Sequence, residues 1–199
     1  MQPVVPFVGL TGGMGAGKST ALEALEGLGA QVLSTDAVVH ELYRDRQVRD
    51  AVLERWGPEV APDGVVDRAE VASRAFAGGD EDRRWLEGLL WPLVGTRIAG
   101  WLEHVRALRP PPRAAVVEVP LLFEAGMEGG FDATIAVIAG EQTRSERAAG
   151  RGHALLEERV ARQLSQEEKA GRATFVVHND GTLGDLRREL TAVLGKLSG

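Results

Sequence analysis

The sequence contains no cysteine, which excludes disulfide bonds, thiolate nucleophiles and cysteine-ligated zinc. It also lacks any run approaching the roughly 18 apolar residues that a membrane-spanning helix needs. Residues 1–7 carry no lysine or arginine and lead directly into a strand-like run, so they do not resemble a signal peptide. These absences predict a soluble, cytoplasmic protein that does not bind membranes.

Positive charge is scarce as well. The 23 Lys and Arg residues are outnumbered by 29 Asp and Glu residues, and the net charge of -6 predicts no broad basic surface for nucleic acid. The 199 residues, 44% of them hydrophobic, are enough for one α/β domain with insertions. We expect small-molecule partners, no nucleic acid, and a monomer or weak homo-oligomer.

Short apolar runs separated by helical patterns predict an α/β fold with a parallel five-stranded sheet flanked by helices. The opening of the chain reads as a strand, a glycine-rich loop, a helix and a second strand, which is the order of a βαβ unit. The strands are expected at Val4–Thr11, Gln31–Leu33, Ala114–Val119, Thr134–Ile138 and Thr174–Val177.

Two segments interrupt this core, which we expect to consist of residues 1–35, 113–140 and 172–199. Residues 36–112 have helical spacing punctuated by turns, and contain all four tryptophans. Residues 141–171 are helical, charged and rich in arginine, as in a segment that moves over a site. The pattern predicts a helical insertion and a helical lid.

The segment Gly12–Ser19 matches the pattern G-x-x-x-x-G-K-[ST] between a strand and a helix. Glycines let a phosphate chain approach the backbone, whose N–H groups and helix N-terminus then act as donors. Lys18 is expected to reach the β- and γ-phosphates, and the Ser19 hydroxyl to bind Mg²⁺. The alternative is a tight strand-to-helix connection. The pattern alone does not separate kinases from GTPases or motor ATPases.

Several further segments resemble the dephospho-CoA kinase family, in family order over nearly the whole chain. They are Val8–Thr20, Val32–Asp36, Leu86–Val94, Val119–Glu124, Glu158–Gln163 and Val176–Gly181. The resemblance implies transfer of the ATP γ-phosphate to the ribose 3′-hydroxyl of dephospho-CoA, giving coenzyme A. It also implies Mg²⁺, a P-loop core, a helical CoA-binding domain and a lid.

The nucleotide site that this resemblance implies combines the glycine loop with arginines of the lid. Arg144, Arg147 and Arg151 lie at i, i+3 and i+7 on one helical face, where they could neutralise the transferring phosphoryl group or form a solvated stripe. Asn179 starts an Asn-Asp-Gly turn, and the family places it beside the nucleotide. The expected ATP-binding residues are Gly13, Met14, Gly15, Ala16, Gly17, Lys18, Ser19, Thr20, Arg147, Arg151 and Asn179, with Lys18 and Arg147 also catalytic.

Asp36 follows the second expected strand, at a position where a carboxylate can accept the proton of the acceptor hydroxyl. The alternative is an N-cap for a helix that begins at Ala37. His40 and Arg44 follow Asp36 at steps of four, so this face could bind the acceptor's phosphates or be a solvated polar stripe.

The end of the third expected strand provides further candidates. Glu118 could bind Mg²⁺ or its water, or be an edge charge. Pro120 and Leu121 are expected to shape a wall of the acceptor site. The chain departs from the family pattern at Ser34, where an aspartate is usual, at Trp91, where a histidine is usual, and at His40, where arginine is common.

Two other kinds of protein share the glycine loop, a nucleoside monophosphate kinase and a GTP-dependent switch. A nucleoside monophosphate kinase would share the core, but the helical block after Asp36 and the segment Pro120–Glu124 argue against it. A GTP-dependent switch normally reads guanine with Asn-Lys-x-Asp, whereas the only asparagine here, Asn179, precedes Asp-Gly.

Overall fold

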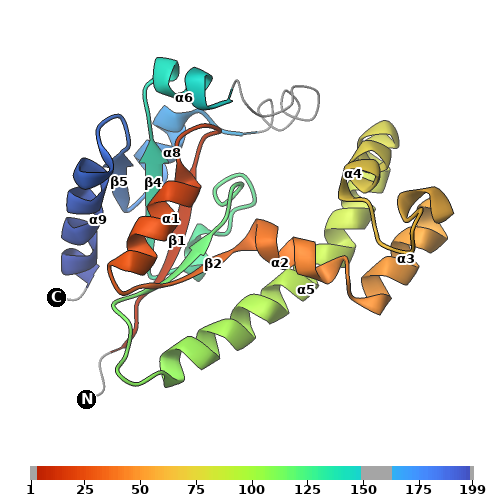
Figure 1. Ribbon diagram of the computed structural model, residues 1–199, viewed down its shortest axis with the longest axis horizontal. Helices are drawn as coiled ribbons and strands as arrows, with labels where there is room; N and C mark the ends of the chain where they lie inside the picture. The colour runs from red at the N-terminus through yellow and green to blue at the C-terminus, as the bar shows by residue number, and fades with distance from the viewer. Residues whose placement is uncertain (1–3, 149–162, 198–199) are drawn as a thin grey trace. The chain divides into compact units, whose positions relative to one another are not determined.

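The computed structural model describes residues 4–148 and 163–197 (Figure 1). A five-stranded sheet has the strand order β2-β3-β1-β4-β5, and β3, β1, β4 and β5 pair in parallel. The α/β class and the parallel sheet are therefore confirmed. The strands are β1 (Phe7–Gly12), β2 (Gln31–Ser34), β3 (Ala115–Glu118), β4 (Ala133–Ile138) and β5 (Phe175–His178).

Contacts divide the chain into two compact units, one formed by Met1–Leu33 with Leu102–Gly199 and the other by Ser34–Trp101. The first contains the sheet, and the second is helical. The boundaries expected at residues 36 and 112 differ from these, since helix α5 (Gly79–Ala107) contributes residues to both units. No helix in the described ranges 4–148 and 163–197 is long and apolar enough to cross a membrane.

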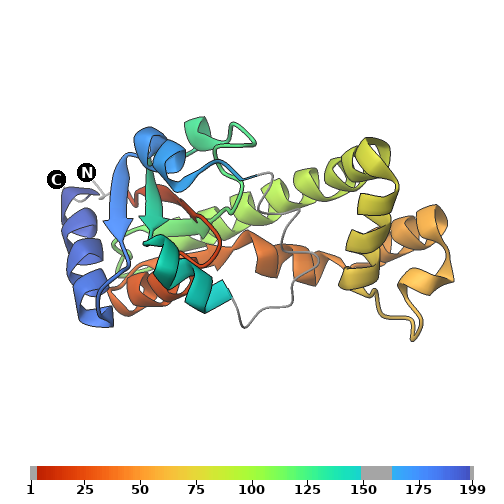
Figure 2. The same ribbon diagram turned by 90° about the horizontal axis from the view of Figure 1, so that it is seen from above.

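Helices cover both faces of the sheet in the first unit. Helix α1 (Lys18–Gly27) and helix α9 (Leu183–Leu197) contact each other on one face. Helix α8 (Gln166–Arg172) contacts β1 and β4, and Figure 2 shows it on the side of the sheet opposite α1. Helix α6 (Glu141–Ala148) follows β4, and a short 3-10 helix, η2 (Glu128–Gly130), precedes that strand.

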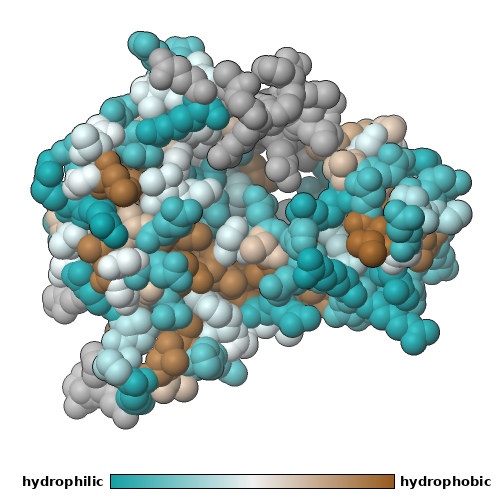
Figure 3. Space-filling view, viewed as in Figure 1, coloured by the Kyte–Doolittle hydropathy of each residue, from teal (hydrophilic) through white to brown (hydrophobic). Residues whose placement is uncertain are grey.

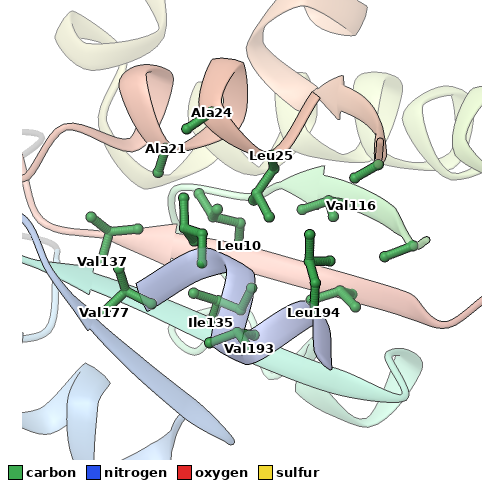
Figure 4. Close-up of a cluster of buried hydrophobic side chains, with 14 of the residues drawn as sticks. Leu10, Ala21, Ala24, Leu25, Val116, Ile135, Val137, Val177, Val193 and Leu194 are labelled. Atoms are coloured by element: carbon green, nitrogen blue, oxygen red, sulfur yellow. The ribbon is translucent and has the colours of Figure 1, made fainter. Parts of the chain in front are cut away.

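The core of the first unit lies between the sheet and the α1–α9 pair (Figure 4). Leu10 and Ile135 point from the strands toward Leu25 and Leu194 of the helices, and all four are fully buried. Each such side chain contributes about 1.5–3 kcal/mol through burial. This apolar layer holds β1, and therefore the loop that follows it, in a fixed place.

The second unit is built from helices α2 (Thr35–Leu42), α3 (Arg46–Trp56), α4 (Arg68–Ala77) and most of α5. Asp45 caps α3 by accepting a hydrogen bond from the Gln47 N–H, and Asp67 caps α4 in the same way. The Trp56 and Trp85 rings meet edge to face at 5.0 Å and join α3 to α5.

Helix α2 begins at Thr35, with Ser34 at the N-cap position. The expectation of a helix beginning at Ala37 was therefore wrong. Asp36 lies inside the first turn, where its negative charge is favourable near the N-terminus of the helix, and it does not occupy the cap. The local capping explanation for Asp36 is removed, because the chain enters its helix two residues earlier.

Candidate functional site

The loop between β1 and α1 depends on two glycines with left-handed backbone. Gly15 has φ 73° and Gly17 has φ 89°. A Cβ atom at Gly17 would lie 2.0 Å from Asn179 Nδ2, and one at Gly15 would lie 2.6 Å from the Arg144 carbonyl oxygen. Both the backbone conformation and the surrounding atoms therefore require glycine here, and the loop backbone stays open to a ligand.

Lys18 begins α1, and its ammonium group bends back over the loop. Lys18 Nζ donates to the carbonyl oxygens of Gly12 at 3.0 Å and Gly13 at 3.2 Å. Ser19 and Thr20 are exposed in the first turn of the same helix. An ammonium group, two hydroxyls and a helix N-terminus thus converge on the loop, an arrangement that binds phosphate.

Asn179 supports this loop from the far end of the chain. Its side chain is buried, and Nδ2 donates to the Ala16 carbonyl oxygen at 2.8 Å. Its backbone N–H bonds to the Ile138 carbonyl oxygen at 2.8 Å, which fixes it at the end of β4. Arg147 donates to the Asn179 carbonyl oxygen at 3.2 Å. The structure therefore brings Asn179 and Arg147, both predicted to bind ATP, together at the loop.

Arg144 and Gln166 also lie at the loop. Gln166 exchanges two hydrogen bonds with the backbone of Ala139, at 2.8 and 2.9 Å, and its Cγ would lie 3.3 Å from a Cβ at Gly13. Arg144 Nε is buried and has no hydrogen-bond partner within the described part of the chain. Gln166 was missed by the sequence analysis, because nothing in its surroundings distinguishes it from a surface glutamine. Arg151 lies outside the described residues, as do residues 149–162 of the expected lid in general.

Glu118 ends β3, the strand next to β1, with Leu10 as its partner in register. Because β3 runs parallel to β1, Glu118 lies at the sheet edge that also carries the glycine loop, and it is 7% exposed. Beyond it, the Pro120 carbonyl oxygen accepts from Thr11 Oγ1 at 3.2 Å, and Leu121 is partly exposed. Within residues 4–148 and 163–197, no three His, Cys, Asp or Glu side chains gather as metal ligands.

The second unit has a pocket of its own, about 460 Å³ in volume, along α2. Asp36, His40 and Arg44 line it together, as the four-residue spacing predicts, and Arg44 Nη2 lies 3.3 Å from His40 Nε2. Arg68, which the sequence pattern did not indicate, lines the same pocket from the start of α4. The lining also includes Glu41, so the pocket carries two carboxylates beside two guanidinium groups and an imidazole, and the guanidinium groups can bind an anion.

Tyr43, the residue before Arg44, is buried and feels the charge of Arg68, one of the residues that line this pocket. Burial raises the pKa of its hydroxyl from 10.0 to about 12, and the positive charge of Arg68 partly opposes that rise. Tyr43 is 8% exposed and is the only tyrosine in the chain.

The tryptophans of the helical segment divide into two kinds. Trp56 and Trp85 pack against each other, and Arg55 lies over the Trp85 ring at 5.6 Å from its centre. Trp91 is 55% exposed. Trp91 therefore faces solvent on α5, whereas Trp56, Trp85 and Trp101 are half-buried.

Comparisons with known proteins point to a single family. A family model described as dephospho-CoA kinase matches residues 6–185. A dephospho-CoA kinase of Thermus thermophilus is 37% identical over 202 residues, covering 100% of this chain and 94% of the relative. A dephospho-CoA kinase of Deinococcus radiodurans is 39% identical over 193 residues, covering 96% and 91%.

Solved structures agree with these sequence matches. A crystal structure from Thermus thermophilus superimposes with a TM-score of 0.79 at 36% identity, covering 98% of this chain and 100% of the other. A dephospho-CoA kinase from Campylobacter jejuni gives a TM-score of 0.62 at 22% identity, covering 97% of each chain, which supports the fold.

Proposed function

The chain belongs to the dephospho-CoA kinase family, and we propose that its glycine loop and its α2 pocket carry out the transfer of the ATP γ-phosphate to dephospho-CoA. It is an ATP-dependent kinase of that family. The observation that carries the proposal is the glycine loop, with Lys18 folded over it and Asn179 buried beneath it.

The nucleotide end consists of loop amides, Lys18 and the first turn of α1. Lys18 exchanges the carbonyl oxygens of Gly12 and Gly13 for phosphate oxygens, a move that its flexible side chain allows. Arg147 and Arg144 neutralise the negative charge that develops on the transferring group, since both border the loop. We assign the same role to Arg151 by its helical spacing alone.

The acceptor end uses Asp36 and the cations of its pocket. The Asp36 carboxylate accepts the proton of the ribose 3′-hydroxyl as that oxygen attacks the γ-phosphorus. The bond from the γ-phosphorus to its bridging oxygen breaks at the same time, and ADP leaves. Arg44, Arg68 and His40 hold the diphosphate of dephospho-CoA. Pro120 and Leu121 form an apolar wall for the acceptor.

The family also implies Mg²⁺, and the residues present fit that ion. Ser19 offers an exposed hydroxyl at the start of α1, and Glu118 offers a carboxylate at the same edge of the sheet. These are hard oxygen donors, and Mg²⁺ usually takes only one or two ligands from the protein, with phosphates and water completing its shell. When bound, the ion supplies positive charge to the phosphates. A need for Mg-ATP supports a cytoplasmic location, and we expect a monomer or weak homo-oligomer.

The test is to incubate the protein with Mg-ATP and dephospho-CoA and to look for coenzyme A by mass spectrometry. We expect coenzyme A and ADP in equal amounts, and no phosphorylation of nucleoside monophosphates offered in place of dephospho-CoA. Lys18→Met should abolish turnover while leaving the melting temperature unchanged. Normal turnover by that variant, or transfer to the monophosphates instead, would contradict the proposal.

A further inference from the structure

Lys169 lies on α8 and is fully buried, which is rare for a lysine. Its ammonium group uses all three of its donors. Lys169 Nζ lies 2.8 Å from Glu124 Oε1, 2.8 Å from the Pro120 carbonyl oxygen and 3.5 Å from Thr11 Oγ1. These partners come from two segments that are distant in sequence, one at Thr11 and one at residues 120–124, and the Lys169 side chain joins both to α8.

Glu124 extends the same network. Its side chain is 13% exposed, and Oε1 also accepts a hydrogen bond from the Leu164 N–H at 2.8 Å. Leu164 leads directly into α8, which carries Lys169 and also Gln166 at the glycine loop. The carboxylate therefore connects the segment after β3 with the segment that precedes α8.

The Pro120 carbonyl oxygen is the meeting point of the network. It accepts two hydrogen bonds, one from Lys169 and one from Thr11 Oγ1 at 3.2 Å. Thr11 immediately precedes Gly12, whose carbonyl oxygen holds Lys18. A continuous path of contacts thus runs from Glu124 to the residue that we expect on the phosphates, and it passes through the expected wall of the acceptor site.

A contribution to stability does not by itself explain the buried ion pair between Lys169 and Glu124. Removing two charges from water costs free energy that their attraction often fails to recover, and apolar replacements of similar size are frequently as stable. The arrangement has a second use, because phosphoryl transfer depends on sub-ångström placement of the acceptor relative to ATP. We infer that Lys169 and Glu124 are positioning residues that fix the Pro120–Leu121 segment relative to the glycine loop. This inference rests on the proposed function.

The experiment uses a double variant, Lys169→Met with Glu124→Gln. It removes both charges together, leaves neither one unpaired, and keeps an oxygen for the Leu164 N–H. We expect a loss of about tenfold or more in kcat, with the ATP KM within about threefold of wild type, because the loop amides and Lys18 are untouched. The concentration of active sites is measured by nucleotide binding, so that kcat is calculated per folded molecule.

The matched control is Arg172→Met with Glu128→Gln. This ion pair also joins α8 to the segment after β3, but it is exposed and touches neither Pro120 nor Thr11. We expect its kcat to stay within about threefold of wild type. The melting temperatures of both double variants are measured beside the kinetics, because a structural role would change those temperatures and leave kcat per folded site unaltered.

A kcat for the Lys169/Glu124 variant within about threefold of wild type would overturn the inference, as would an equal loss in the control. If the double variant does not fold, Thr11→Val replaces it, since this near-isosteric change removes one of the two donors to Pro120. A kcat loss above about threefold then supports the inference, and a smaller loss overturns it. Wild-type turnover of dephospho-CoA, measured first, distinguishes failure of the proposed function from failure of this inference.

Discussion

The two units present their candidate residues in different ways. At the glycine loop of the first unit, Asn179 and Gln166 are held by hydrogen bonds to the backbone. In the second unit, Asp36 and Arg44 are exposed side chains on one helix and the turn after it. The difference indicates that the nucleotide end is preorganised by the backbone, whereas the acceptor end can adjust its side chains to the ligand.

Both units bury apolar side chains, the second at residues such as Val48, Val52 and Val71, and they differ in the extent of that core and in their surfaces. The first has a continuous apolar cluster between sheet and helices. The face of the second unit drawn in Figure 3 is mainly hydrophilic, and ion pairs such as Arg46–Asp50 and Arg74–Glu70 cover its helices. Exposed pairs of this kind contribute little to stability. Loss of a side chain that supports the loop backbone, such as Asn179, should therefore disturb structure and function together, while loss of an exposed side chain in the α2 pocket should disturb function alone.

The largest effect is expected for Asp36→Asn. The change keeps the size of the side chain but removes the base, so kcat should fall by about 10²–10⁴-fold. Because Asp36 is exposed, the melting temperature should stay the same. Steady-state kinetics and calorimetry measure the two quantities. The control is Asp63→Asn, an exposed aspartate in a turn of the same unit. Near-normal turnover by the Asp36 variant would remove it as the catalytic carboxylate.

Asn179→Ala tests the opposite side of the contrast. The Ala16 carbonyl oxygen loses its buried donor, which should cost about 1–3 kcal/mol in the free energy of unfolding. The loop should also loosen, and the ATP KM should rise by about tenfold. Denaturant unfolding and nucleotide titration measure these changes. His178→Ala is the control, since this exposed neighbour hydrogen-bonds through its backbone N–H. An unchanged ATP KM with lowered stability would mean that the bond is structural only.

Arg68→Ala sharpens the description of the α2 pocket. Losing one charged hydrogen bond of about 1.5 kcal/mol should raise the KM for dephospho-CoA by about tenfold and leave the ATP KM unchanged. Initial rates at varied concentrations of each substrate distinguish the two. Arg84→Ala serves as the control, because Arg84 is 75% exposed on α5. A rise in the ATP KM instead would contradict the assignment of this pocket to the acceptor.

The smallest effect concerns pH. Folding raises the Tyr43 pKa from 10.0 to about 12, so the folded state keeps its proton where the unfolded state loses it. This contribution to stability is complete below pH 10 and is lost as the pH rises to about 12. Ultraviolet difference absorbance follows Tyr43 alone, as the only tyrosine. Titration near 10 in the folded protein would contradict burial of this hydroxyl, and the denatured protein provides the reference.

The parts of the fold that are local in sequence were predicted correctly. The glycine loop lies within one short segment, and the apolar runs indicated every strand of the sheet to within a few residues. The start of α2 was misplaced, because Ser34 and Asp36 are both good N-caps and sequence does not say which one the chain uses. Family membership removes both alternative functions, the nucleoside monophosphate kinase and the GTP switch.

The missed residues depend on contacts between distant segments. Lys169 and Gln166 occur in a short charged helix and read as solvated side chains, yet one is fully buried and the other lies at the glycine loop. Arg68 reads as the start of an ordinary helix, and only the fold brings it to Arg44. No spacing rule within a helix or strand links such pairs, so the sequence alone does not show them.

The bond from Asn179 to the Ala16 carbonyl oxygen joins residues 163 positions apart. During synthesis the N-terminal part of the chain leaves the ribosome first, so the glycine loop emerges early. Its hydrogen bond to Asn179 can form only after the end of β5 has also emerged. A nascent chain therefore carries the nucleotide-binding segment long before it can hold a nucleotide firmly. Incomplete chains that end before residue 179 are therefore expected not to bind ATP firmly.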